Sequence, residues 1–66
     1  QFIAAYDLPA ALGDVLGHLV LGKTPQAIAD VRDVSVGTVR SQIVELRERT
    51  GTRRTTDLVR LVLTHR

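Results

Sequence analysis

Residues 24–43 read TPQAIADVRDVSVGTVRSQI, and this stretch is the most informative part of the 66-residue chain. Its opening Thr-Pro pair favours a helix start. The hydroxyl of Thr24 can accept from a backbone N–H of the first turn, and the N–H group that proline lacks would have no helical partner there. Ala27, Ile28 and Val31 recur at helical spacing and are expected to form the buried face of a short helix. The Asp-Val pair that follows then makes a tight turn into a second helix.

This second helix is expected to carry the exposed chemistry of the stretch. Ser35 is a favourable cap, and the helix is predicted to run to about Thr50 and to stop at Gly51. A count of about 100° per residue divides its surface into two faces. The face expected to be buried comprises Val39, Ile43, Leu46 and Thr50. The face expected to be exposed comprises Gly37, Arg40, Val44 and Arg47, with Ser41 at its edge.

Two further helices are predicted on either side of this pair. The first covers about 9–21, begins with proline and stops at Gly22. Its apolar stripe consists of Leu12, Val15, Leu16 and Leu19. The last covers 56–65, with a cap at Thr56 and Asp57 near its positive end.

No segment alternates as a strand would, so the predicted fold class is all-α. It has four helices: a three-helical helix-turn-helix core and a C-terminal dimerisation helix. A chain of this length has no room for a second core, so a single domain is expected. It is expected to cover residues 8–66. Residues 1–7 are expected to be an N-terminal tail or the end of a linker. Since the chain begins with glutamine rather than methionine, a regulatory domain is expected upstream.

Charge is distributed unevenly along the chain. Residues 1–39 carry two basic and four acidic side chains, whereas residues 40–66 carry seven arginines and three acidic side chains. A basic half suits an anionic partner such as nucleic acid. On charge alone, a solvated helix surface of mixed charge is an equal alternative.

No catalytic, metal-binding or membrane-spanning pattern is evident in the sequence. Cysteine is absent, and His18 and His65 are far apart with no matching ligand set. The glycines lack the spacing of a phosphate-binding loop. No apolar run approaches the ~20 residues that a membrane span needs. We therefore predict no enzyme activity, no cofactor, no metal and no membrane contact.

Arginines on the exposed face of an amphipathic helix are common and by themselves indicate no function. Here the face follows a capped turn from a short helix, which favours a helix placed in a DNA major groove. Arg40 is expected to bind guanine O6 and N7, while Val44 either touches a thymine methyl group or is simply a partly exposed apolar residue. Basic and hydroxyl side chains near helix ends are candidate phosphate contacts, with capping as the alternative role of the hydroxyls. The phosphate candidates are Lys23, Thr24, Ser35, Thr38, Arg47, Arg53 and Arg54.

The last predicted helix has more apolar surface than one core contact needs. Its apolar residues spread over about 200°, whereas a stripe of ~100° suffices for one contact. We expect a second copy of the chain to cover Val59 and Leu63; burial within the chain or cover by an upstream domain are the alternatives. The predicted dimer interface comprises Val59, Val62, Leu63 and Arg66.

Residues 8–65 resemble the LuxR/GerE-type helix-turn-helix domain, which lies at the C-terminus of many bacterial transcription regulators. The resemblance rests on Ile28-Ala29, on SVGTVR at 35–40, and on Gly51 followed by RTTDLV at 54–59. The chain departs from the family pattern at Leu12, Ala27, Gln42, Val44 and Thr50. These positions bear on affinity and sequence preference more than on the fold.

The resemblance implies sequence-specific binding of double-stranded DNA through the helix at about 36–50, with base-reading positions at Arg40, Ser41 and Val44. It also implies homodimerisation through the last helix, phosphate contacts at Thr38, a cytoplasmic protein that acts at the bacterial nucleoid, and RNA polymerase as a further candidate partner. A promoter-binding domain like region four of sigma factors is one alternative, although such a region normally ends with its reading helix. A degenerate domain that binds proteins is the other.

Overall fold

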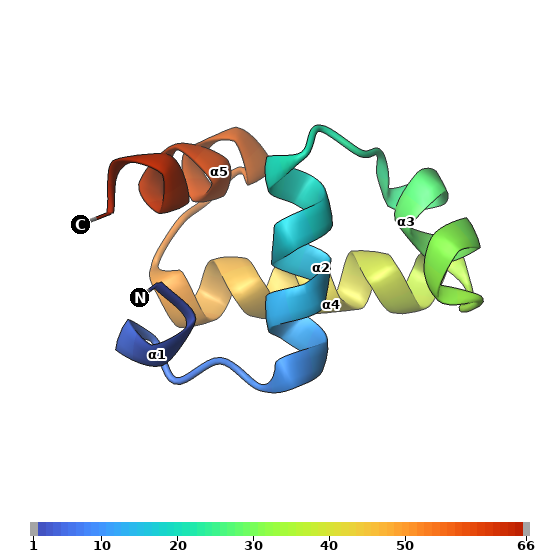
Figure 1. Cartoon of the computed structure of the whole chain (residues 1–66), viewed down its shortest axis with the longest axis horizontal. Helices are drawn as coiled ribbons and strands as arrows, with labels where there is room; N and C mark the ends of the chain where they lie inside the picture. Colours follow the sequence, from blue (N-terminus) through green and yellow to red (C-terminus); the bar gives the residue numbers. More distant parts are fainter. Residues whose placement is uncertain (1, 66) are drawn as a thin grey trace.

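The computed structural model describes residues 2–65, and every regular element in that range is an α-helix (Figure 1). The four longer helices are α2 (Ala10–Val20), α3 (Pro25–Arg32), α4 (Val36–Thr50) and α5 (Thr55–Thr64). The all-α class and the four predicted helices are thereby confirmed. A one-turn helix, α1 (Phe2–Ala5), lies in the stretch expected to be a tail or linker.

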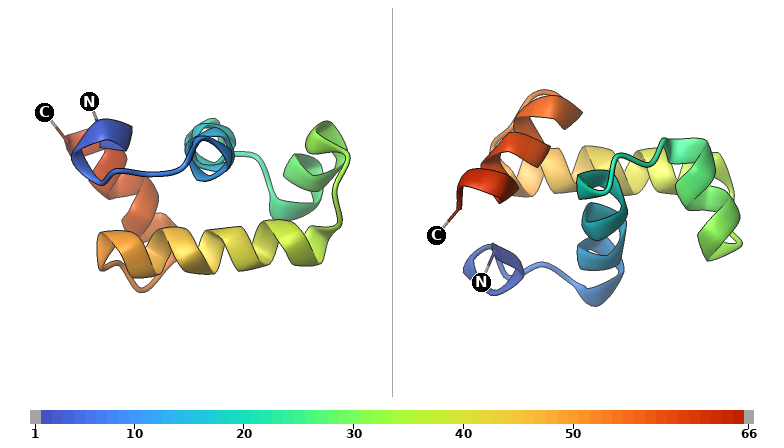
Figure 2. Two further views of the ribbon diagram at one scale, coloured as in Figure 1. Left: turned by 90° about the horizontal axis from the view of Figure 1, so that it is seen from below. Right: turned by 45° about the horizontal axis from the view of Figure 1, so that its top comes forward.

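The longest helix, α4, forms the base on which the other long helices pack. In Figure 1, α2 crosses in front of α4, while α3 lies at its N-terminal end and α5 at its C-terminal end. The left view of Figure 2 shows α2, α3 and α5 on one side of α4. The opposite side of α4 is therefore left without a covering helix among the described residues.

The core lies where these four helices meet. Its most deeply buried large side chains come one or two from each long helix and comprise Val15, Ile28, Val39, Leu46 and Leu58. The predicted stripe of α2 is confirmed, because Leu12, Val15, Leu16 and Leu19 are all buried. The predicted inner face of α4 is confirmed at Val39, Ile43 and Leu46, and Thr50 at its end is half-buried.

The buried face of α3 differs from the prediction. Ile28 is buried as expected, but Val31 is 61% exposed and the second buried residue is Ala29. The inner stripe is rotated toward Ala29 and Arg32, and Arg32 forms an ion pair with Asp14 of α2. An arginine can bury its aliphatic stem while its charged head reaches a partner at the edge of the core. Arg32 is therefore half-buried on the inner side of α3, whereas Val31 faces outward.

Glycines end α2 and α4 as the sequence predicts. Gly22 follows α2 with a φ of 86°, and Gly51 follows α4 with a φ of 72°. These left-handed conformations cost little for a residue without a Cβ atom. Each glycine therefore stops its helix and turns the chain toward the next one.

The start of α5 differs from the prediction. The helix begins at Thr55, with Arg54 at the N-cap position and no side-chain capping bond. The predicted cap at Thr56 is wrong, because this residue already lies inside the first turn. Asp57 in that turn accepts from Nε of Arg54 at 3.3 Å. Its negative charge also complements the positive end of the helix, which reduces the need for a hydroxyl cap.

The turn between α3 and α4 depends on Ser35. The Ser35 side chain accepts from the Thr38 backbone N–H at 3.1 Å, so replacing Ser35 with alanine should destabilise the domain by about 1 kcal/mol. A loss of this size lowers the melting temperature of a domain this small by roughly 4–8 °C. Thermal unfolding followed by circular dichroism measures it. Ser41→Ala is the matched control, because Ser41 is exposed within the same helix. Equal melting temperatures for Ser35→Ala and the unmodified chain would rule out the capping role.

Candidate nucleic-acid interface

The uncovered side of α4 brings the predicted base-reading residues together. Arg40, Ser41 and Val44 are all exposed on this helix, and Val44 has 43% of its surface accessible. Gly37 precedes them on the same face, and a Cβ atom at that position would meet only the Ser35 hydroxyl oxygen, at 3.8 Å. The N-terminal half of α4 is therefore slim and open to a partner along this face.

Arg40 has the free guanidinium that base reading requires. This guanidinium makes no hydrogen bond or ion pair with any other residue between 2 and 65. An arginine with all its N–H groups available can donate two parallel hydrogen bonds to guanine O6 and N7. This exposed side chain therefore needs no internal bond to be broken before it meets a nucleic acid.

The hydroxyl groups predicted to meet phosphates serve as helix caps in the structure. Thr24 accepts from the Ala27 backbone N–H at 3.2 Å, and Ser35 accepts from the Thr38 backbone N–H. The hydroxyl oxygens of Ser35 and Thr38 also lie 2.9 Å apart, within hydrogen-bonding distance. All three residues are exposed. Capping is therefore established for Thr24 and Ser35, and a phosphate contact at these exposed helix starts stays a prediction.

The predicted basic phosphate contacts fall into two groups. Arg53 is exposed, and its side chain has no partner among the described residues. The others have internal partners. Nζ of Lys23 lies 3.1 Å from Nδ1 of His18, and Nε of Arg54 donates a hydrogen bond to the carboxylate of Asp57. Arg53 is thus the freest of these basic side chains to follow a phosphate backbone.

Arg47 has a structural contact that the sequence analysis missed. Its Nη1 donates to the backbone carbonyl of Arg53 at 2.7 Å, which ties the end of α4 to the loop before α5. The side chain is half-buried, and its Nε atom is buried without a partner in the part of the chain described. The helical count placed Arg47 on the exposed face but gave no information on how the following loop folds back.

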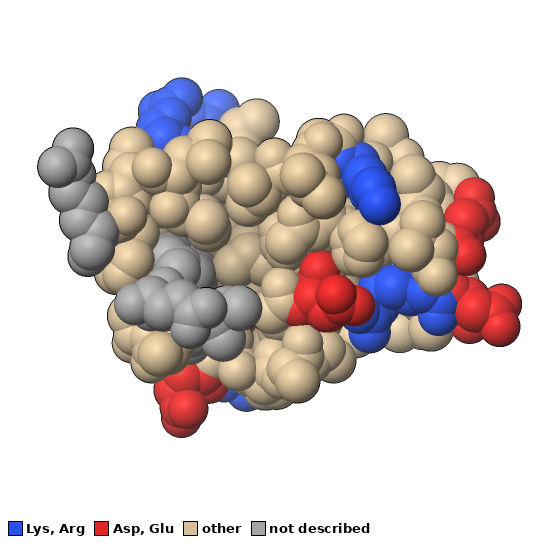
Figure 3. All heavy atoms as spheres, in the orientation of Figure 1, with Lys and Arg blue, Asp and Glu red and all other residues tan. Residues whose placement is uncertain are grey.

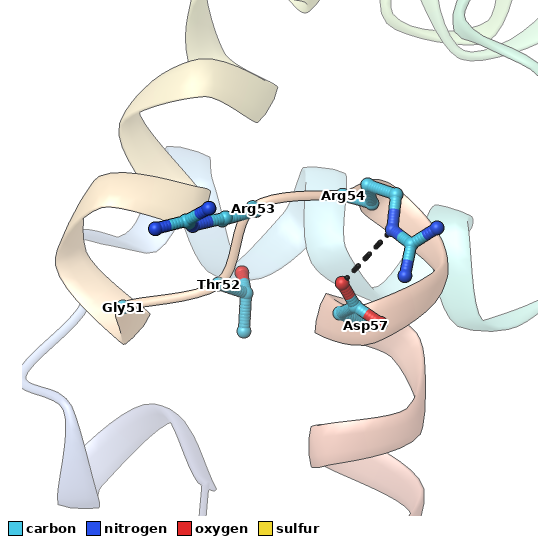
Figure 4. Close-up of a pocket in the computed structure, with 5 residues that line it drawn as sticks. All are labelled: Gly51, Thr52, Arg53, Arg54 and Asp57. Carbon is cyan, nitrogen blue, oxygen red and sulfur yellow. Dashed lines mark hydrogen bonds and ion pairs between the residues drawn. The ribbon is translucent and has the colours of Figure 1, made fainter.

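The loop between α4 and α5 forms an open pocket of about 670 Å³, lined by Gly51, Thr52, Arg53, Arg54 and Asp57 (Figure 4). The side chains of Arg53 and Arg54 point away from one another in this view, and Arg54 turns toward Asp57. Two diverging arginines do not converge on a single small ligand. They suit an extended anionic partner better, because each can meet a separate group along it.

Glu48 is a residue of the exposed face that the sequence analysis did not weigh. It is exposed on α4, one turn after Val44, and has no partner among residues 2–65. The neighbouring acidic residue Glu45 is neutralised by Arg49, whose Nε lies 2.9 Å from its carboxylate. An unpaired carboxylate repels phosphates, so the C-terminal part of this face favours a nucleic acid less than the part around Arg40.

The opposite side of the molecule, which carries α2, differs from the exposed face of α4 in its charges. Figure 3 shows the α2 side with an acidic group near the middle of the face, further charges toward α3 and at the rim, and uncharged surface between them. Here Asp14 pairs with Arg32 and lies 4.0 Å from Nε2 of His18. Because these charges are engaged with one another, this side offers little to an anionic partner.

The predicted dimer residues of α5 are unequally exposed. Val59 and Val62 are half-buried and pack against the core of their own chain, together with Leu61. Leu63 is 68% exposed, and Arg66 lies outside the described residues. The apolar surface of α5 that its own chain leaves uncovered is therefore concentrated at Leu63.

Within residues 2–65 no three metal-ligating side chains of the His, Cys, Asp and Glu types come together. None of the helices described is long and apolar enough to cross a membrane. Comparison of the chain with protein-family models, characterised proteins and solved structures gives no match.

Proposed function

We propose that this chain binds double-stranded DNA as the output domain of a transcription regulator, with α4 lying in the major groove. One observation carries the proposal: α4 is covered on one side only, and its uncovered side presents Arg40 without an internal partner. Helix-turn-helix proteins place the second helix of the motif in the groove with its N-terminal residues at the bases. Arg40 and Ser41 lie in the N-terminal half of α4 (Val36–Thr50), and Val44 lies just past its middle.

The surrounding charges support the same orientation. The exposed side chain of Arg53 lies beyond the C-terminal end of α4, while the exposed starts of α3 and α4 present backbone N–H groups at their positive ends. In this proposal they meet phosphates on the two sides of the groove. Phosphate contacts fix position and orientation, and the base contacts of α4 supply the sequence preference.

Equilibrium binding to random-sequence duplex DNA across a salt series tests the proposal. Because each neutralised phosphate releases condensed counterions, the logarithm of the binding constant should fall linearly with the logarithm of salt concentration. A module that binds only proteins would show no salt-dependent binding to DNA. Absence of measurable binding at low salt would contradict the proposal and favour that module.

We further propose that two copies pair through α5 and place two α4 helices in successive major grooves. Half-sites about one helical turn, ~10 base pairs, apart would match such a pair. The separate helix α5 after the Gly51 stop is also the feature that favours the LuxR/GerE-type assignment over a sigma region four. RNA polymerase as a further partner, an upstream regulatory domain and action at the nucleoid remain part of this proposal.

The pairing proposal predicts the behaviour of Leu63→Glu. Because Leu63 is the most exposed apolar residue of α5, a charge there should weaken self-association while the helical circular dichroism signal stays unchanged. Sedimentation analysis of both proteins measures this. Thr64→Glu adds the same charge at the next exposed position and should have a smaller effect. A monomer before and after the Leu63 change would exclude the proposed pairing.

A further inference from the structure

Val44 is an apolar residue that is exposed on α4. It is 43% exposed and does not belong to the residues that pack on the core. A β-branched residue is also a poorer helix former than alanine, lysine or glutamate at an exposed position. Its apolar surface is accessible on the side of α4 that carries Arg40 and Ser41.

Arg40 and Val44 are separated by one helical turn on this side. Four residues of α-helix rise by about 6 Å, and successive base pairs of DNA are ~3.4 Å apart. Two side chains at this spacing on a helix that follows the groove reach base pairs one or two steps apart. The two side chains also favour different groups on the bases, since the arginine donates hydrogen bonds and the valine makes apolar contacts only.

We propose that this pair reads a guanine and a thymine one or two base steps apart, with Val44 in contact with the thymine C5 methyl group. The inference rests on the proposed DNA binding and names the sequence class that α4 selects. Arg40 matches the O6 and N7 acceptors of guanine, while an apolar side chain in the major groove favours the thymine methyl. Cytosine at the same place would lose solvent from its N4 amino group without gaining an acceptor, which opposes binding.

The test uses duplexes that the unmodified chain selects from a random pool. In the selected duplex, each thymine is replaced in turn by deoxyuridine, which removes the methyl group and keeps the base pair. At one thymine per half-site, this change should weaken binding about three- to five-fold, the size expected for one buried methyl group. Each guanine is replaced in turn by 7-deazaguanine, which removes the N7 acceptor. The sensitive guanine should lie one or two steps from the sensitive thymine.

Val44→Ala supplies the decisive comparison. This variant should bind the thymine and deoxyuridine duplexes within about two-fold of one another, because the contact that distinguishes them is gone. Val31→Ala is the matched control: Val31 is exposed on α3, and this variant should keep the full difference between the two duplexes. Arg40→Ala should likewise lose its sensitivity to 7-deazaguanine.

The outcomes separate this inference from the function on which it rests. Specific DNA binding without sensitivity to any thymine methyl, or with a sensitivity that Val44→Ala retains, would overturn the inference and leave the DNA-binding proposal standing. A sensitive guanine and thymine more than two steps apart would overturn it as well. Failure to bind any duplex at low salt would overturn both.

Discussion

Replacing Leu58 with alanine is expected to destabilise the domain by about 2–5 kcal/mol, the range for removing a large buried aliphatic side chain. Leu58 is fully buried and anchors α5, which packs against both α2 and α4. A chain of 66 residues has a free energy of unfolding on the order of 3–10 kcal/mol. The change should therefore remove much of the stability and leave a measurable unfolded population at 37 °C. Urea unfolding followed by circular dichroism at 222 nm gives the difference.

Leu63→Ala is the matched control for this prediction. It makes the same substitution in the same helix at a site with 68% exposure. Exposed positions away from special contacts usually change stability by less than about 0.5 kcal/mol. If the two variants lost equal stability, the packing of α5 onto the core through Leu58 would be wrong. Dilute protein is used, so that self-association through Leu63 does not contribute to the measured stability.

Replacing Arg40 with alanine is expected to weaken binding to a selected duplex by about 1–3 kcal/mol and to relax the base preference at one position. That range corresponds to roughly 5- to 150-fold in the dissociation constant. The expectation follows from a guanidinium that is exposed and has no internal partner among the described residues. Fluorescence anisotropy with the selected duplex, and with one carrying a changed guanine, measures affinity and preference together.

Arg49→Ala removes the same charge from another side of α4 and serves as the control. Arg49 pairs with Glu45, and nine residues after Arg40 it lies about half a turn around the helix. This variant should keep its base preference and lose little affinity. Equal losses in the two variants would assign the effect of Arg40 to net charge. An unchanged affinity and preference for Arg40→Ala would remove this residue from the base-reading set.

The helices were predictable from the sequence because their signals are local. Thr24 and Ser35 cap through their own hydroxyls, and Gly22 and Gly51 take left-handed conformations that glycine adopts easily. The inner face of α4 followed from helical periodicity alone. Such features depend on a few neighbouring residues, so sequence spacing is enough to place them.

The rotation of α3 was not predictable in the same way. The apolar spacing predicted Val31 beside Ile28, whereas the structure buries Ala29, which lies about 160° away from Val31 around the helix axis. In the structure Ala29 is buried, and Arg32 pairs with Asp14 on another helix. That partner lies 18 residues away in the sequence, where local spacing carries no information.

The candidate interface also combines features that local sequence spacing predicts with a contact that it does not predict. The shared face of Arg40, Ser41 and Val44 could be predicted from the helical count, and their exposure agrees with it. The attachment of Arg47 to the Arg53 carbonyl could not, because it depends on the path of the loop after α4. Glu48 was visible in the sequence, and the same count places it on the exposed face within about a quarter-turn of Arg40.

Nuclear magnetic resonance mapping shows whether the uncovered side of α4 contacts DNA. Amide shifts of the labelled chain are followed as duplex DNA is added at low salt. We expect the largest changes along the exposed residues of α4, near Arg40 and Val44, with further changes in the loop at 51–54. Exposed positions of α2, such as Asp14 and Gly17, should change little. Changes concentrated on α2, or no changes at all, would show that this side of α4 does not bind DNA.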